Sequence, residues 1–332
     1  MQPNPKPQLD NRARILQTQR VTEALLKEVK QVIVGKSTVL EYVAAGILTE
    51  GCHILFEDMP GLAKSVMASA VSQAAGCDFR RVQFTPDLLP GDITGTYVYN
   101  QNRNEFNLRA GPIFSNFLLA DEINRASPKT QSALLEAMAE KQVSIEGTTH
   151  RLPAPFMVLA TQNPVEQEGT YPLPEAQLDR FMLKLSMGYP SRAEEKEILM
   201  RRASRGRDNF EVKAIASPEV LVECARAVET VHVSPAIYDY ITDIIERTRK
   251  HADLHAGSSP RGSLALFKLA RAWAATHGRT YVTADDIRVL AVPVLAHRLI
   301  LKGEARFSGR TGTAIMQEIL EQTPVPKFTV PS

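Results

Sequence analysis

Cysteine, an excess of either charge and long apolar runs are all scarce in this chain of 332 residues. Its three cysteines, Cys52, Cys77 and Cys224, lie far apart and form no CxxC pair, which disfavours a disulfide framework and a zinc site. The 39 basic and 37 acidic residues leave a net charge of +2, so the overall charge does not predict nucleic-acid binding. We therefore expect a protein of the reducing cytoplasm with no nucleic-acid partner.

The sequence also lacks a stretch that predicts a membrane span. Its longest apolar stretch, residues 287–301, is short and is interrupted by two arginines, a histidine and a proline. The amino-terminal residues have no apolar core of the kind found in secretory signals. With 44% hydrophobic and 23% charged residues, the composition is typical of a globular protein with a real core, and we expect no membrane insertion.

Five short apolar runs recur through the first 190 residues, with helical patterns between most of them. They are HILFE from His53, RRVQF to Phe84, FLLAD to Asp121, PFMVLATQN to Asn163 and FMLKLSM from Phe181. Nearly continuous apolar runs suit strands that are covered on both faces, and their alternation with helices predicts a parallel sheet. Residues 1–190 are therefore predicted to form a three-layer α/β domain with five parallel strands.

Two insertions interrupt this alternation, and both are typical of hairpins. The first is GDITGTYVYNQNRNEFNLRAGPIF, with its turn at NQNRN, and the second is QVSIEGTTHRLPAP, with its turn at GTT. After Pro190 only helical patterns remain, so residues 191–332 are predicted to form a second, all-helical domain.

A glycine-containing loop followed by Lys-Ser joins the first predicted strand to a helix. It runs Asp58, Met59, Pro60, Gly61, Leu62, Ala63, Lys64, Ser65, Val66. Such a loop directs backbone N–H groups at phosphates, with the lysine on the outer phosphates and the serine hydroxyl on Mg²⁺. Asp58 and Ala63 stand where the GxxxxGK[ST] pattern has glycines, and we expect Ala63 to be tolerated only at a helical φ. The segment predicts ATP binding; the alternative is a plain strand-to-helix loop with a solvated lysine.

Two adjacent acids, Asp121 and Glu122, follow the third apolar run. If Lys64 and Ser65 hold a triphosphate, a neighbouring strand that ends in acids completes the site. Asp121 would bind Mg²⁺, directly or through water, and Glu122 would orient the attacking water. A helix N-cap is the alternative, but it does not explain two neighbouring carboxylates.

Three further residues complete the predicted site. Asn163 ends the fourth run, whose strand we expect between those of the first two motifs, and its amide would reach the γ-phosphate or the attacking water. Arg180, in LDRF, would stabilise transition-state charge in a neighbouring subunit, unless it forms a surface pair with an aspartate. Arg261 begins a helix of the second domain and would sense the phosphate, unless it is an ordinary helix-start arginine. The basic pair Arg80–Arg81 is expected to be solvated, because no aromatic residues are interleaved for stacking on bases.

Taken together, these segments resemble AAA+ ATPases, and more narrowly the MoxR family. The matching segments are FEDMPGLAKS, FTPDLLPGDITG, GPIFSNFLLADEINRASPKTQSALLEAM, VLATQNPVEQEGTYPLPEAQLDRF and SSPRGSLALFKLARA. The resemblance implies that Lys64 and Ser65 belong to Walker A and that Asp121 and Glu122 form Walker B. It further implies the following roles: sensor 1 for Asn163, trans arginine finger for Arg180 and sensor 2 for Arg261. Within this family, Asp58 and Ala63 are familiar variants of Walker A.

The resemblance also implies assembly and partners. Members form rings, usually hexamers, remodel other proteins in a chaperone-like way, and often act with partners that carry a von Willebrand factor A domain. The two hairpins would be the helix-2 insert and the pre-sensor-1 hairpin. Three alternatives stay open: the ATPase subunit of a magnesium chelatase, a nucleic-acid motor such as a helicase loader, and a nucleotide-gated scaffold with little hydrolysis.

Overall fold

The structure is a computed structural model that describes residues 10–163 and 170–326, so the part of the predicted motif just after Asn163 lies outside it. Its contacts divide the chain into two compact units. One is Leu25–Pro218, and the other joins the described part of Met1–Ala24 to that of Glu219–Ser332. The first unit extends past residue 190 and includes α7 (Arg192–Arg205).

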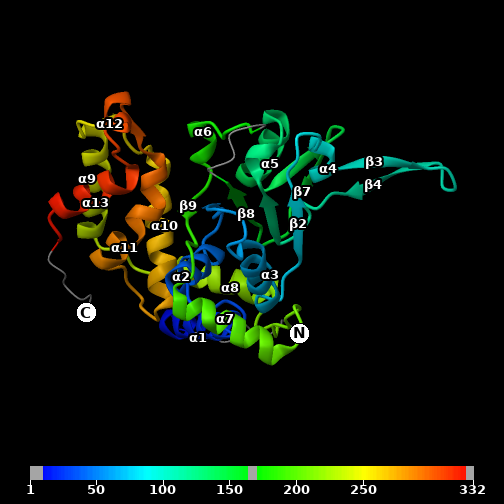
Figure 1. Ribbon diagram of the computed structural model, residues 1–332, viewed down its shortest axis with the longest axis horizontal. Coiled ribbons are helices and arrows are strands. Elements are labelled where there is room, and N and C mark those ends of the chain that lie inside the picture. Colours follow the sequence, from blue (N-terminus) through cyan, green and yellow to red (C-terminus); the bar gives the residue numbers. More distant parts are fainter. Residues whose placement is uncertain (1–9, 164–169, 327–332) are drawn as a thin grey trace, which may run out of the picture. The chain divides into compact units, whose positions relative to one another are not determined.

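A five-stranded parallel sheet forms the centre of the first unit (Figure 1). Its strands are β1 (Ile54–Glu57), β2 (Phe79–Gln83), β5 (Phe117–Asp121), β8 (Met157–Gln162) and β9 (Leu183–Leu185). The strands lie in the order β2-β5-β8-β1-β9, and every pairing is parallel, which confirms the predicted sheet. Because β8 lies between β5 and β1, the predicted place of the strand that leads to Asn163 is confirmed as well.

Helices cover both faces of this sheet, because successive side chains of a strand point to opposite sides. On one face, Leu55 and Leu118 share a buried core with α5 (Pro128–Glu140). On the other face, α2 (Ser37–Ile47) approaches closely: a Cβ on Gly46 would lie 3.3 Å from Cδ1 of Ile54. The three-layer α/β architecture is thus confirmed.

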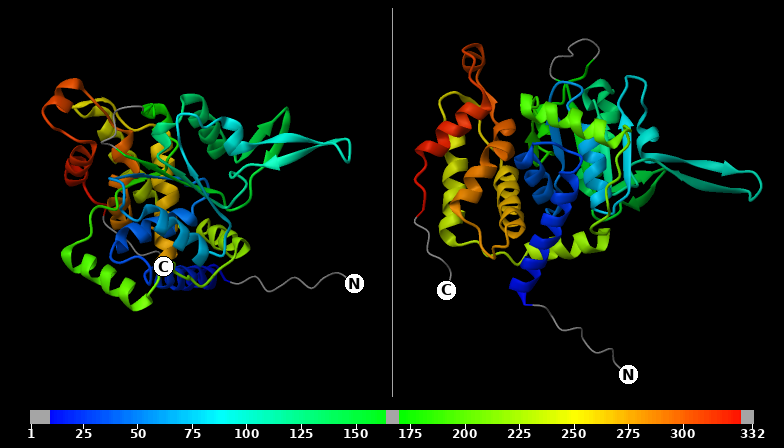
Figure 2. Two further views of the ribbon diagram at one scale, coloured as in Figure 1. Left: turned by 45° about the vertical axis from the view of Figure 1, so that its right-hand side comes forward. Right: turned by 60° about the horizontal axis from the view of Figure 1, so that its bottom comes forward.

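Two antiparallel hairpins interrupt the alternation, as predicted. The first pairs β3 (Gly95–Asn100) with β4 (Glu105–Ala110) after the short helix α4 (Pro90–Thr94), and it projects from its unit (Figures 1 and 2). The second pairs β6 (Gln142–Ile145) with β7 (Thr148–Arg151). Only the glycine of the predicted GTT lies in its turn: the turn residues are Glu146 and Gly147, both with positive φ, and the two threonines belong to β7. A two-residue turn of this kind matches the twist of the paired strands.

The remaining helices include those of the second unit. They are α1 (Asn11–Val29), α3 (Lys64–Ala74), α6 (Glu175–Leu178), α8 (Pro218–Val228), α9 (Pro235–Lys250), α10 (Pro260–Thr276), α11 (Ala284–Leu295), α12 (Gly303–Phe307) and α13 (Gly312–Gln322), with 3-10 turns at Ile123–Arg125 and Ala296–Arg298. Among its described residues, the second unit adds to its helices one short antiparallel strand pair that the sequence does not predict, β10 (Leu254–Ala256) with β11 (Ile300–Leu301). Within the described ranges, no helix is both long and apolar enough to cross a membrane.

Candidate nucleotide site

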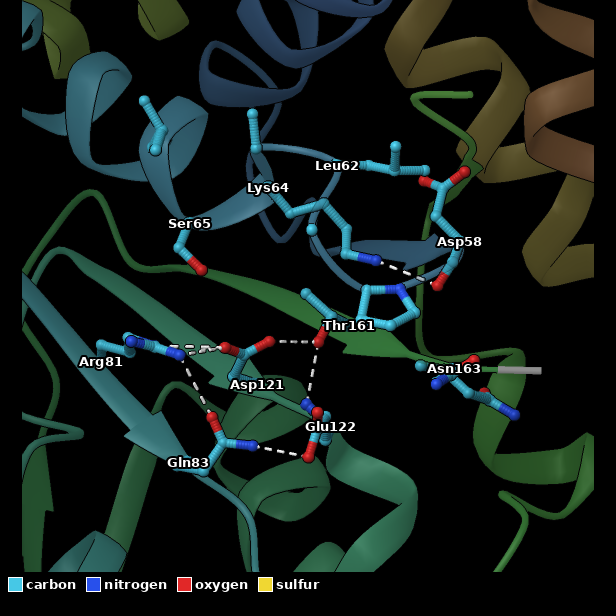
Figure 3. A pocket seen from close by; sticks show the side chains of 15 residues that line it. Asp58, Leu62, Lys64, Ser65, Arg81, Gln83, Asp121, Glu122, Thr161 and Asn163 are labelled. Carbon is cyan, nitrogen blue, oxygen red and sulfur yellow. Dashed lines mark hydrogen bonds and ion pairs between the residues drawn. The ribbon is translucent and has the colours of Figure 1, made fainter. Parts of the chain in front are cut away.

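A cavity of about 370 Å³ opens at the carboxyl edge of the sheet in the first unit (Figure 3). Parallel strands bring their carboxyl ends to one edge, and this is where ligands of open α/β sheets bind. The lining residues come from the loop after β1, from α3, and from the ends of β2, β5 and β8. They are Asp58, Pro60, Gly61, Leu62, Ala63, Lys64, Ser65, Val66, Arg81, Gln83, Asp121, Glu122, Thr161, Gln162 and Asn163.

The loop from β1 to α3 forms one wall of the cavity. Gly61 has φ 83°, and no atom lies within 4 Å of the place where its Cβ would be, so the backbone there is open to a ligand. Ala63 has φ 57° and directly precedes α3, which begins at Lys64. The expectation of a helical φ at Ala63 is therefore wrong, and the left-handed conformation costs a non-glycine residue about 1–2 kcal/mol. The amino-terminal end of α3 lies at the cavity, and anions bind favourably at the free N–H groups of such a helix end.

The Lys64 side chain folds back on the loop that precedes it. Its Nζ donates hydrogen bonds to the carbonyl oxygens of Asp58 (3.0 Å) and Met59 (3.1 Å). Burial lowers the pKa of the Lys64 ammonium from its ordinary value, although the charges of Asp58, Asp121 and Glu122 oppose that shift. Met59 contributes this carbonyl but is not among the lining residues. The ammonium is thus held beside the cavity by neutral carbonyl groups.

The carboxylate of Asp58 binds the segment that follows β9. The carboxylate accepts hydrogen bonds from the Ser186 hydroxyl (2.6 Å) and from the backbone N–H groups of Met187 (2.7 Å) and Gly188 (3.2 Å). Asp58 is buried, with 6% of its surface exposed. The residue that stands in place of a glycine therefore ties the phosphate loop to the segment after β9.

Asp121, the last residue of β5, has protein partners on both carboxylate oxygens. Oδ1 accepts a hydrogen bond from Oγ1 of Thr161 (2.6 Å). Oδ2 accepts from Nη2 (2.7 Å) and Nε (3.1 Å) of Arg81 on β2. Figure 3 shows this network on the side of the cavity that faces Ser65 and Lys64.

Glu122 follows in the left-handed conformation, with φ 55° and ψ 50°. Its backbone N–H donates to Oγ1 of Thr161 (2.8 Å), so one hydroxyl connects both acids. Its Oε2 accepts from Nε2 of Gln83 (2.7 Å) and from Nη1 of Arg125 (2.9 Å). Non-glycine residues held at positive φ concentrate at functional sites, where surrounding contacts fix the strained conformation.

The structure brings most predicted site residues to this one cavity. Asn163 is buried and belongs to the lining. Arg180 does not: it donates from Nη1 to the carbonyl oxygen of Leu135 on α5 (2.7 Å). Arg261 is an exposed residue in the first turn of α10, in the second unit. The catalytic roles of all three stay predictions.

Four lining residues were missed by sequence reasoning: Arg81, Gln83, Thr161 and Gln162. The expectation that Arg81 is merely solvated is wrong, because it pairs with Asp121. The available signal was the register of a parallel pair, since Gln83 lies directly opposite Asp121 and alternation places Arg81 on the same side of β2.

The oxygen donors at the cavity fit a Mg²⁺ ion that is shared with nucleotide phosphates. Within the described ranges, no cluster of three or more His, Cys, Asp or Glu side chains is arranged to hold a metal. Mg²⁺ in nucleotide sites is bound through one or two protein oxygens and the substrate phosphates, with water completing the shell. The hydroxyl of Ser65 and the carboxylate of Asp121, both at this cavity, fit that pattern.

Comparison with known proteins agrees with this geometry. The family model of ATPases associated with various cellular activities (AAA) matches residues 53–183, and that of the AAA lid domain matches residues 246–319. The uncharacterized protein YeaC of Bacillus subtilis is 48% identical, over 91% of this chain and 93% of its own length. The chaperone MoxR1 of Mycobacterium tuberculosis is 42% identical, over 92% and 82%.

A solved structure extends the similarity to three dimensions. The crystal structure of a presumed ATPase from Cytophaga hutchinsonii has a TM-score of 0.88 and 42% identity, covering 95% of this chain and 98% of that one. By contrast, the magnesium-chelatase 38 kDa subunit of Acidiphilium rubrum is 31% identical over only 55% of this chain and 52% of its own. Because the similarity to MoxR1 runs through most of both proteins, the chain belongs to the MoxR family of AAA+ ATPases.

Proposed function

We propose that this ATPase requires Mg²⁺ and uses hydrolysis to remodel, mature or assemble partner proteins. The observation that carries the proposal is the shared cavity: Lys64 and Ser65 line it from one side, and Asp121 and Glu122 line it from the other. Four groups that a triphosphate–metal unit needs thus face one space. The chaperone name of MoxR1, a relative over nearly the full chain, supports proteins as the substrate.

Each residue has a role that follows from its chemistry. Lys64 and the backbone N–H groups of residues 61–66 bind the phosphates, while Ser65 and Asp121 hold Mg²⁺, which when bound neutralises charge on the phosphate oxygens. Glu122 orients the attacking water. Asn163 supplies an amide to the γ-phosphate or to that water. These assignments rest on side-chain type and on position at the cavity edge.

We further propose a ring, most simply a hexamer, because AAA+ ATPases commonly oligomerise. Arg180 would then act in the site of a neighbouring subunit, and Arg261 would couple nucleotide state to the helical domain. Residues 1–190 and 191–332 would be the two functional domains, since the last strand of the sheet ends at Leu185. A partner with a von Willebrand factor A domain and a cytoplasmic location belong to the same proposal.

The alternatives are weaker on specific observations. Similarity to a magnesium-chelatase subunit covers about half of each chain. The scaffold hypothesis rested on the altered phosphate loop, yet Asp58 serves the fold of that loop and leaves Lys64 at the cavity.

Replacing Glu122 by Gln separates binding from hydrolysis. The amide keeps the shape of the side chain but is a poor acceptor for the proton of water, so we expect turnover to fall by about 10²–10⁴-fold. Nucleotide affinity should stay within a few-fold of wild type. Phosphate release and titration with a fluorescent ATP analogue measure the two quantities. Glu136→Gln, at an exposed position of α5, is the matched control.

Two outcomes would count against the proposal. Full turnover in Glu122→Gln would remove Glu122 from the reaction. If turnover falls as expected but the ATP-bound variant retains no defined protein that wild type releases after hydrolysis, the remodelling role fails while the ATPase assignment stands.

A further inference from the structure

Arg81 forms an ion pair with Asp121, the proposed metal ligand of the site. Its guanidinium places two donors, Nη2 and Nε, on the single oxygen Oδ2 of Asp121, at 2.7 and 3.1 Å. The second oxygen, Oδ1, accepts from Thr161. Nη2 of Arg81 also donates to Oε1 of Gln83 (3.2 Å). Both carboxylate oxygens thus have protein partners (Figure 3).

The two partners of Asp121 differ in how easily they are displaced. Thr161 is 2% exposed, and its hydroxyl also accepts the backbone N–H of Glu122, so moving it would leave buried polar groups unpaired. The Arg81 side chain is 52% exposed, whereas that of Asp121 is 13% exposed. Water can solvate a displaced guanidinium, and ion pairs of this exposure contribute little net stability. Arg81 is therefore the partner that can leave.

We propose that Arg81 occupies the cation position at Asp121 and must leave it when nucleotide and Mg²⁺ bind. Arg81 is then a positioning residue: it keeps the carboxylate compensated and aimed at the cavity, and it weakens the hold of Asp121 on a divalent cation. The inference rests on the proposed role of Asp121 as a metal ligand.

The test measures how strongly Mg²⁺ tightens ATP binding. For the full-length protein, the dissociation constant for ATP in EDTA is divided by that in saturating Mg²⁺. The affinity of Mg²⁺ for free ATP contributes the same factor to this ratio in every variant. It therefore cancels when the ratio of one variant is compared with that of another. Because Arg81→Gln removes a competitor for Asp121, we expect its ratio to rise by roughly threefold, the size expected for an exposed ion pair.

Matched variants make the result specific. Arg80 is exposed and precedes Arg81 on β2, so its side chain points to the other side of the strand, and Arg80→Gln should leave the ratio unchanged. Arg81→Lys keeps the charge and should fall between wild type and Arg81→Gln. If Arg81→Gln is poorly folded by its melting temperature without nucleotide, Arg81→Lys against Arg80→Lys provides the same comparison.

Asp121→Asn distinguishes failure of the inference from failure of the site assignment. If Asp121→Asn leaves the ratio at the wild-type value, Asp121 does not hold the metal and both proposals fall. If Asp121→Asn lowers the ratio while Arg81→Gln leaves it unchanged or lowers it, only the role of Arg81 is overturned. A rise in Arg81→Gln that disappears in the double variant with Asp121→Asn supports it.

Discussion

The two ends of the five-stranded sheet hold polar side chains in opposite ways. At the carboxyl end, Lys64 and Asp121 keep charged groups beside an open cavity. At the amino end, His53 lies just before β1 and is buried: Nδ1 accepts the backbone N–H of Val158 (3.0 Å), and Nε2 donates to the carbonyl oxygen of Met138 (3.1 Å). Burial lowers the pKa of His53 to about 4, so its ring is neutral at pH 7.

This difference separates charged groups beside a cavity from polar groups that fix the fold. At the carboxyl end, Asp121 pairs with the charged and exposed Arg81, and such a partner can be exchanged for a ligand. At the amino end, the neutral ring of His53 is hydrogen-bonded to backbone groups of β8 and α5. These partners belong to the fold and are not exchanged for a ligand. Changes at the amino end should therefore alter stability and leave nucleotide affinity unchanged.

Asp58 is an exception to this difference. It lies at the carboxyl end of the sheet, but like His53 it is buried and hydrogen-bonded to backbone groups. Asp58→Ala leaves the N–H groups of Met187 and Gly188 without their acceptor, and we expect the free energy of unfolding to fall by about 3 kcal/mol. Urea denaturation followed by circular dichroism measures the loss. Asp58→Asn, which keeps one acceptor oxygen, should lose less. Wild-type stability in Asp58→Ala, together with weaker ATP binding, would instead place this carboxylate with the ligand-binding groups.

His53 sharpens the comparison through pH. In the unfolded chain its pKa is about 6.5, above the folded value of about 4, so the unfolded state binds the proton first. The stabilisation is complete above pH 6.5 and is lost as the pH falls toward 4. Between pH 7.5 and pH 5, this one group should cost about 2 kcal/mol of unfolding free energy.

His53→Gln tests that loss, because glutamine cannot be protonated. The decline in unfolding free energy from pH 7.5 to pH 5 should be smaller in this variant by about 2 kcal/mol. The exposed His255 provides the control, since His255→Gln should decline as wild type does. An equal decline in all three proteins would show that His53 does not titrate differently on folding. ATP affinity at pH 7.5 should be the same in each.

The sequence was sufficient to place the two halves of the cavity. Runs such as FLLAD are apolar throughout until their last residue, which marks a strand buried on both faces with a polar carboxyl end. Since carboxyl ends of parallel strands share an edge, Asp121 and Lys64 had to lie near each other once β1 and β5 were recognised. That prediction depended only on the order of the strands and motifs along the chain.

What the sequence did not reveal depends on pairings between distant segments. The partners of Asp121 come from β2 and β8, 40 residues away in either direction, and they follow from register and rotamer rather than from any local pattern. The same holds for Asp58, whose acceptor role depends on Ser186 and Gly188 far along the chain. The pair β10–β11 was missed because strands of three and two residues show no alternation.

Ala63 gives the smallest and most local prediction. Its φ of 57° is unfavourable for alanine by about 1–2 kcal/mol, and glycine would remove that strain at an entropic cost of about 0.5–1 kcal/mol. Ala63→Gly should therefore raise the free energy of unfolding by about 0.5 kcal/mol, measured by urea denaturation. Glu146, at φ 49° in the exposed turn between β6 and β7, is a matched position away from the cavity, and Glu146→Gly should gain a similar amount. If Glu146→Gly gains stability and Ala63→Gly loses it, the phosphate loop adopts a different backbone in solution, and the ligand-binding end of the sheet is less fixed than its contacts indicate.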